Sequence, residues 1–230
     1  PSPYMTLYLV EGMARALEFK VDVPQDMVKR AWSYVARHYR DEYMAMIRKK
    51  DCCYEFITYL NFVASSFPDE SWLGGALSKE ERAEMLAFSF AHWTKQSPYL
   101  KAQLALTLKR MGRAKDAELV FASVMDSAKT DRDLGTFWAQ EDRSWLWYND
   151  TIETHAFALR TLTELMPKDK KRDGLAQWLL LNKKLNHWKS TRATAEAIYS
   201  LVYFMRQDQS LGVREAISVS IGDQKTELVF

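Results

Sequence analysis

The residues that form tight turns are scarce in this chain. Only 8 of its 230 residues are glycine and 6 are proline, which is low for a protein made of many short strands joined by turns. No run of about 18 apolar residues occurs, so we expect no direct membrane insertion in this segment. Cysteine is limited to the neighbours Cys52 and Cys53, and adjacent cysteines seldom meet disulfide geometry. A turn-rich β-fold, a membrane-spanning bundle and a disulfide scaffold are therefore not expected.

An excess of one charge is also lacking. The 32 basic and 30 acidic residues leave a net charge of +2, which gives no strong field toward nucleic acid or anionic lipid. The densest basic run, Lys168–Arg172, follows a proline and is interpreted as a solvated loop. We expect no nucleic-acid partner.

What the chain does have is apolar content at helical spacing. Hydrophobic residues make up 47% of it, enough for a large core. Periodicity and cap residues predict helices over 3–18, 24–39, 52–66, 79–95, 98–111, 113–128, 151–166, 172–185 and 191–206. The β-branched and aromatic content of 52–66 leaves a strand open there. Residues 129–150 form the longest irregular segment.

Particular residues indicate how these helices begin and which face they bury. Ser78–Glu81 and Asp150–Glu153 both fit the capping box, in which a side chain at each end satisfies a backbone N–H. The faces expected to point inward carry Leu7, Val10, Ala14 and Leu17 in the first helix and Met27, Ala31, Tyr34 and Val35 in the second.

Helix openings recur along the chain at steps of roughly 40 to 55 residues, a length that suits a helical hairpin with its loops. They lie at Ser2–Tyr4, near Asp51–Tyr54, at Ser97–Tyr99, at Asp150-Thr151 and at Ser190-Thr191. The most apolar helices fit an inner ring and the more charged ones an outer ring. We therefore predict an all-α fold, an α/α toroid of helical hairpins over residues 1–211 that lacks its N-terminal part.

After Gly212 the periodicity changes from helical to alternating. Residues 216–221 and 226–230 read as two strands joined by a turn at Gly222-Asp223. Because a lone hairpin cannot bury its apolar face, we expect residues 212–230 to be the start of a following β-domain.

Four stretches resemble the helical thioester domain of the bacterial alpha-2-macroglobulin family. They are Ser2–Val35, Ser97–Val120, Trp147–Leu162 (WYNDTIETHAFALRTL) and Trp178–Leu201, which ends in a Trp-x-Ser-Thr helix opening. The resemblance implies a toroid domain within a large periplasmic or extracellular protein, with membrane tethering through another part of the parent left open. Such a protein is cleaved by a protease, changes conformation and entraps the protease. Its expected partners are target proteases and neighbouring β-domains of the same chain.

Many members of that family form an internal thioester between a cysteine and a glutamine three residues later. This chain departs from the pattern, because Cys52 is followed three residues on by Glu55, and Cys53 by Phe56. We therefore expect no thioester in this fragment. The motif would lie upstream of residue 1 or be missing from the parent protein.

The segment before the helix at 151 holds the candidate functional residues. Asp150 and Glu153 could act as a general acid/base pair beside an aromatic platform of Trp145, Trp147 and Tyr148, as paired carboxylates do in glycosidases. The structural interpretation, which we favour, is that both acids cap the helix. The aromatic side chains then pack the preceding turn against the ring of helices.

Two further candidates are His155 and Trp188. His155 has no second histidine or cysteine at ligand spacing, so a metal site is unsupported and a buried, hydrogen-bonded histidine is favoured. Trp188, before Ser190-Thr191, repeats the aromatic-then-cap arrangement of residues 147–151, which argues for a structural device. We expect no cofactor.

These observations favour a non-enzymatic structural module of an alpha-2-macroglobulin-like protein that inhibits or traps proteases. One alternative is an α/α-toroid enzyme that processes glycans through Asp150 and Glu153. A second is a tetratricopeptide-like interaction scaffold, suggested by residues 98–124, although its 34-residue period does not persist.

Overall fold

The computed structural model describes residues 2–44, 53–138, 147, 148 and 150–208, together with the strands 216–221 and 224–229. Its α-helices are α1 (Pro3–Glu18), α2 (Gln25–His38), α4 (Tyr54–Ser65), α5 (Lys79–Ala91), α6 (Pro98–Arg110), α7 (Ala114–Met125), α8 (Thr151–Leu165), α9 (Lys171–Leu181) and α10 (Thr191–Gln207). Short turns of other helix types are η1 (Tyr39–Tyr43), η2 (Glu70–Leu73) and η3 (Trp93–Lys95). The strands are β1 (Lys129–Asp131), β2 (Gly135–Phe137), β3 (Ala216–Ile221) and β4 (Gln224–Val229).

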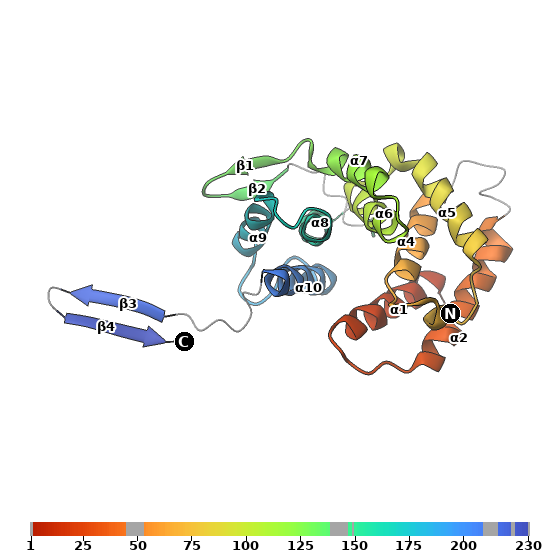
Figure 1. The fold of residues 1–230 in the computed structure, drawn as a ribbon, viewed down its shortest axis with the longest axis horizontal. Coiled ribbons are helices and arrows are strands. Elements are labelled where there is room, and N and C mark those ends of the chain that lie inside the picture. The colour runs from red at the N-terminus through yellow and green to blue at the C-terminus, as the bar shows by residue number, and fades with distance from the viewer. Residues whose placement is uncertain are drawn as a thin grey trace.

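The helices form two layers of a ring. α1, α4, α6, α8 and α10 follow one another around the inside, each in contact with the next (Figure 1). α2, α5, α7 and α9 each pack outside the inner helix that precedes them in the chain. α4, α6 and α8 are buried along most of their length, as an inner layer requires. The predicted all-α toroid of helical hairpins is confirmed.

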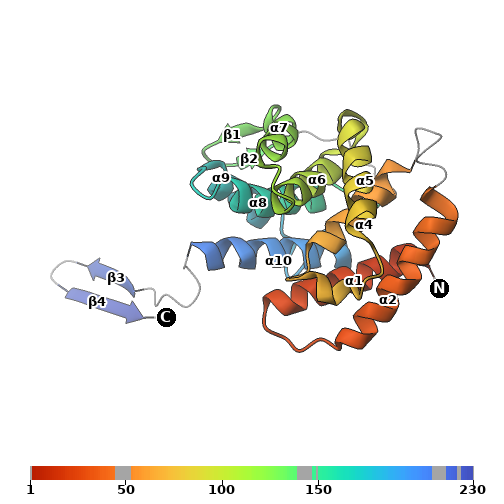
Figure 2. The same cartoon turned by 45° about the vertical axis from the view of Figure 1, so that its right-hand side comes forward.

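α1 and α10 are the two ends of the inner layer, and they lie side by side (Figure 2). They are joined by long side chains. Arg15 of α1 donates to Glu196 of α10 at 2.7 Å, and the Tyr199 hydroxyl of α10 donates to the Glu18 carboxylate of α1. Since these contacts close the ring, the open superhelix expected of a tetratricopeptide-like scaffold is not what this chain forms.

The inner helices begin where the sequence offers a side-chain cap. Ser2, Ser97, Asp150 and Ser190 each accept a backbone N–H from the first turn of α1, α6, α8 and α10. In the outer layer, Ser78 and Glu81 form the complete capping box of α5. At α8 only the Asp150 half of the predicted box is seen, because the Glu153 carboxylate turns to Arg192 instead.

Three details differ from the sequence expectations. In α2 the buried face carries Val28, Trp32, Val35 and Ala36, and Met27 is 45% exposed. The buried face is shifted by one position from the expected one, because it accommodates Trp32, which has a larger side chain than Ala31. The helix predicted over 79–95 ends at Ala91 and continues as η3. The segment predicted to be irregular contains the hairpin β1–β2.

The segment 52–66, for which a strand was left open, is helical over Tyr54–Ser65.

The β1–β2 hairpin lies on α9 through a contact between two glycines. Gly135 has a φ of +81°, a conformation that side chains disfavour. A Cβ added at Gly135 would lie 2.3 Å from the Gly174 carbonyl oxygen, and one added at Gly174 would lie 2.2 Å from Thr136 Oγ1. This close approach fixes the hairpin to the outer layer.

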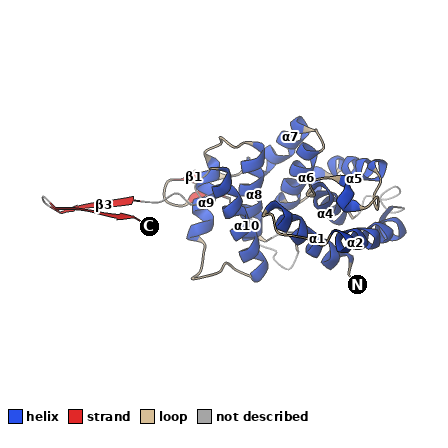
Figure 3. Ribbon diagram, turned by 60° about the horizontal axis from the view of Figure 1, so that its bottom comes forward, coloured by secondary structure: helices blue, strands red, loops and turns tan. Residues whose placement is uncertain are grey.

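The other hairpin, β3–β4, lies beyond α10 and away from the helices (Figure 3). Its strands pair antiparallel from Ala216 with Val229 to Ile221 with Gln224. None of the described helices is long and apolar enough to span a membrane.

Candidate functional site

Aromatic rings gather where the N-terminal ends of α1, α8 and α10 meet. The Trp147 ring lies 5.1 Å from that of Tyr4, 5.2 Å from that of Tyr59 and 5.2 Å from that of Tyr148. Tyr4 comes from the first turn of α1 and Tyr59 from the middle of α4. Trp147 and Tyr148 are thus brought together as the sequence suggested, whereas Trp145 lies outside the described residues.

The two acids next to this platform are engaged with cations. Asp150 accepts the Glu153 backbone N–H at 3.0 Å and pairs with Lys189 Nζ at 3.3 Å. Glu153 pairs with Arg192 at 2.6 Å. Arg192 also donates to the Tyr4 hydroxyl at 3.1 Å and to the Trp147 carbonyl. Arg192 therefore ties the aromatic turn, α1 and α8 to α10.

The charged network continues inward along α1 and α10. Arg15 pairs with both Glu11 and Glu196, and Tyr59 donates its hydroxyl to Glu11 at 2.7 Å. We call this set the central cluster: Tyr4, Glu11, Arg15, Tyr59, Trp147, Asp150, Glu153, Lys189, Arg192 and Glu196.

The cavity inside the central cluster is very small. Its volume is about 10 Å³, and its walls include Tyr4, Tyr59, Trp147 and Arg192. Such a volume is about that needed for one water molecule. It has no space for a sugar ring, and neither Asp150 nor Glu153 is among the residues that line it.

Acids outnumber cations in the central cluster. The carboxylates are Glu11, Asp150, Glu153 and Glu196, and the cations are Arg15, Lys189 and Arg192. Burial raises the pKa of Glu153 to about 8 against the pull of Arg192, and the negative charges of Asp150, Glu196 and Glu11 raise it further. An excess carboxylate in a buried cluster is stabilised by taking up a proton, and the raised pKa of Glu153 makes it the group that takes one up most readily.

A second buried cation lies further along the ring. Arg160 of α8 is 1% exposed and donates to Glu18 at 3.1 Å. Its guanidinium carbon lies 4.7 Å from the Tyr199 ring centroid and 5.9 Å from that of Phe62, within cation–π range. Together with Arg15 and Glu196 it forms the seam, the set of contacts that joins α1, α8 and α10.

His155 points away from the central cluster. Its ring lies between Trp138 and Trp178, with centroids 4.2 Å and 3.8 Å away. Nδ1 donates to the Thr151 carbonyl at 2.7 Å. Burial lowers the pKa of His155 to about 4, although the Thr151 bond opposes this shift. A neutral imidazole stacked between two indoles acts as a packing group.

Trp188 is also placed by packing. It is 4% exposed, and its Nε1 donates to the Leu179 carbonyl at 2.8 Å. It therefore fixes the turn before α10 against α9. Within the described part of the chain, no group of three or more His, Cys, Asp or Glu residues could hold a metal ion.

Sequence reasoning missed most of the central cluster. Glu11 shares a helix face with Leu7 and Ala14, and Glu196 shares one with Ala193 and Ser200. A charged residue in the middle of an otherwise buried face signals a buried ion pair. That signal was present, but it names no partner, because the partners lie on helices far apart in the sequence.

Comparisons with known proteins support the fold. No protein-family model and no curated protein matches the chain. Among solved structures, the chain is similar to trypsin-activated alpha-2-macroglobulin from Escherichia coli, with 20% identity and a TM-score of 0.56 over 99% of this chain. It is also similar to native Escherichia coli alpha-2-macroglobulin spanning domain MG7 to the C-terminus, with 23% identity and a TM-score of 0.58 over 97% of this chain. The chain spans only 14% and 32% of those two chains. The fold that the resemblance implied is confirmed.

Proposed function

We propose that this chain is a non-enzymatic module of a bacterial alpha-2-macroglobulin-like protein that inhibits or traps proteases by a change of conformation. The observation that carries the proposal is the fold likeness over nearly the whole chain, which includes both the toroid and the following hairpin. Residues 212–230 would then open the next β-domain. Periplasmic or extracellular localisation follows from the same likeness.

The chemistry of the ring centre supports a non-enzymatic role. Asp150 caps a helix and pairs with Lys189, and Glu153 pairs with Arg192. A general acid/base pair needs access to substrate, whereas Asp150 and Glu153 are only 6% and 4% exposed. The ionisable groups of the central cluster instead hold helices together.

The mechanism would act through contacts between domains. A protease cleaves the parent protein at another place, and the neighbouring β-domains then bind a different surface of the toroid. No residue described here needs a covalent role. Cys53, at the N-cap of α4 with a φ of +64°, has Phe56 at the position where a thioester would need glutamine.

The test uses the parent protein and trypsin. If the parent traps the protease, trypsin mixed with it keeps cleaving a small chromogenic peptide but loses activity on casein. Hydrogen exchange of residues 3–18 and 191–207 should change on cleavage, because their surroundings change. Equal casein digestion with and without the parent, together with unchanged exchange, would contradict the proposal.

A second experiment with the parent protein tests for enzymatic activity. The double variant Asp150→Asn, Glu153→Gln keeps the size of both side chains but replaces their carboxyl groups with amides, which cannot act as a general acid or base. As a structural module, the parent carrying it should still protect casein from trypsin. Turnover of a polysaccharide by the wild type that this variant abolishes would favour the glycan-processing alternative instead.

A further inference from the structure

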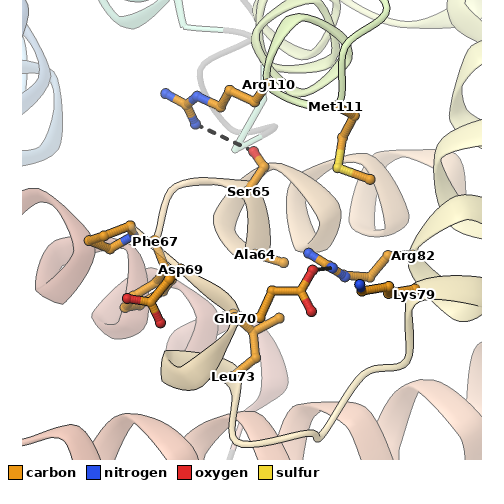
Figure 4. Close-up of a pocket in the computed structure, with 11 residues that line it drawn as sticks. Ala64, Ser65, Phe67, Asp69, Glu70, Leu73, Lys79, Arg82, Arg110 and Met111 are labelled. Atoms are coloured by element: carbon orange, nitrogen blue, oxygen red, sulfur yellow. Dashed lines mark hydrogen bonds and ion pairs between the residues drawn. The ribbon is translucent and has the colours of Figure 1, made fainter.

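A larger hollow lies at the rim of the ring and shares no residue with the central cluster. This rim pocket is formed by the C-terminal ends of α4 and α6, by η2 and by the first turn of α5 (Figure 4). Its volume is about 310 Å³, at the small end of the range for ligand sites. It can hold side chains of a peptide and is too small for a large cofactor.

The floor of the rim pocket is apolar. Ala64, Phe67 and Leu73 line it and are 3%, 8% and 3% exposed. Met111 adds an apolar wall and is 38% exposed. An aliphatic group placed on this floor would leave water and be stabilised by the hydrophobic effect.

Arg82 brings a buried cation to the same pocket. Its side chain is 9% exposed and pairs with Glu70, whose side chain is 59% exposed. Arg82 Nε is buried and has no hydrogen-bond partner among the described residues. Figure 4 shows the Arg82 guanidinium meeting Glu70 inside the pocket. Since Glu70 is mostly in water, it can move aside and expose a cation that remains in place.

The other charges leave this side of the pocket positive. Lys79 lies beside Arg82 (Figure 4) and forms no ion pair within the part of the chain that the structure describes. Asp69, on the opposite side in Figure 4, accepts the Ser71 backbone N–H at 2.8 Å. Arg110 donates to Ser66 at 2.9 Å and pairs with Glu164. Glu70 alone therefore faces two cations.

We propose that the rim pocket binds a peptide segment that carries a carboxylate side chain beside an aliphatic one. The carboxylate takes the place of Glu70 on Arg82 and Lys79, and the aliphatic side chain covers Ala64, Phe67 and Leu73. Arginine in a largely desolvated setting suits recognition of a planar carboxylate. The apolar floor favours a peptide over a bare anion, because phosphate has no apolar group that could cover Ala64, Phe67 and Leu73.

The test measures binding of two peptides to the 230-residue chain by two-dimensional NMR. The probes are acetyl-Leu-Glu-Leu-amide and acetyl-Leu-Gln-Leu-amide. We expect the first to shift the backbone amides of residues 64–73 and 79–82, and to bind about tenfold more tightly than the second, the ratio of a charge-assisted to a neutral contact. Inorganic phosphate should leave these amides unshifted at the same concentration.

Variants separate the proposal from a general effect on the fold. Lys79→Glu should weaken binding of the glutamate peptide about tenfold, whereas Lys115→Glu, also exposed in the first turn of a helix, should leave it unchanged. Glu70→Gln should tighten binding, because it frees Arg82. Equal binding of the two peptides, tighter binding of phosphate than of the glutamate peptide, or no shift with either wild type or Glu70→Gln would overturn the proposal.

Discussion

At the scale of single residues, the molecule keeps several ionisable groups away from water and fixes their protonation by burial. Glu153 is the acid whose pKa is raised most clearly, to about 8. His155 is a base whose pKa falls, to about 4. Both shifts make the stability of the fold depend on pH, and they do so in opposite directions.

Glu153 should make the protein less stable as the pH rises toward 8. Its ordinary pKa is 4.5, so between about 4.5 and 8 the folded state binds a proton that the unfolded state has lost. The free energy of unfolding therefore falls across that window. Urea unfolding at pH 6.5 and pH 8 should give a loss of about 1–2 kcal/mol, which Glu153→Gln removes. Glu118→Gln, on the exposed face of α7, serves as the control and should keep the loss.

His155 should make the stability of the fold depend on pH in the acidic range. Its ordinary pKa is 6.5, so between about 4 and 6.5 the unfolded state binds the proton and stability falls as the pH decreases. The contribution is about 3 kcal/mol over the whole window. In His155→Phe, which keeps a ring between Trp138 and Trp178, this dependence should disappear. A variant with an unchanged slope between pH 4.5 and 6.5 would show that the imidazole is not the group responsible.

At the scale of helices and hairpins, caps and glycines carry the local information. Asp150 and four serines cap helices as their positions in the sequence suggested. Ser97 does more than Ser190, because its hydroxyl also donates to the Tyr148 carbonyl at 2.7 Å. It thereby links α6 to the aromatic turn.

Removing these two serine caps should have unequal costs. Ser190→Ala should lower the free energy of unfolding by about 1 kcal/mol, the ordinary value for a cap. Ser97→Ala loses the cap and the bond to Tyr148, and should cost about 2 kcal/mol. Thermal or urea unfolding of the two variants measures the difference. Equal losses would mean that the Ser97–Tyr148 bond contributes nothing to stability.

Two helical glycines should respond to alanine with opposite signs. At Gly174 an added Cβ would lie 2.2 Å from Thr136 Oγ1 and 2.8 Å from the Thr136 backbone nitrogen, so Gly174→Ala should cost about 1–3 kcal/mol. At Gly12, in α1, nothing lies within 4 Å, and Gly12→Ala should stabilise the protein by about 0.5–1 kcal/mol. Unfolding curves of both variants, compared with the wild type, check the two signs.

The helices could be predicted from the sequence because each carries its own signals, such as Ser97-Pro98 before α6 and Gly112 after it. The hairpin β1–β2 could not, since its strands have three residues each and are held by the Gly135–Gly174 contact with α9. Asp150 could likewise be predicted as a cap because that signal is local. The pairing of Glu153 with Arg192 could not be predicted. Both contacts depend on residues about 40 positions apart, and no local pattern reports them.

At the scale of the whole molecule, closure of the ring depends on the seam that joins α1, α8 and α10. α4, α6, α8 and α10 each contact the preceding inner helix in the ring. At the seam, Arg15 lies between Glu11 and Glu196, and Glu18 accepts from Tyr199 and Arg160. A small number of partly buried ion pairs and hydrogen bonds, with the contact of the Phe19 and Tyr199 rings, thus closes the ring.

Breaking the seam should loosen both ends of the ring together. Arg15→Met leaves Glu11 and Glu196 buried without their shared cation, which should cost about 3–5 kcal/mol. Hydrogen exchange should rise in α1 and α10 and stay unchanged in α6. Arg113→Met removes a partly exposed pair with Asp116 and should cost less than about 1 kcal/mol. A uniform rise in exchange over all helices after Arg15→Met would contradict a local seam.

The seam also has a consequence for synthesis. Arg15 and Glu196 are 181 positions apart, so α1 leaves the ribosome long before its partner exists. Contacts of such long range form late in folding. Until α10 has been synthesised, the face of α1 that will contact it is exposed to water. That face carries Glu11, Arg15 and Glu18. This charged face stays hydrated in the nascent chain, whereas an exposed apolar face would promote aggregation with other chains.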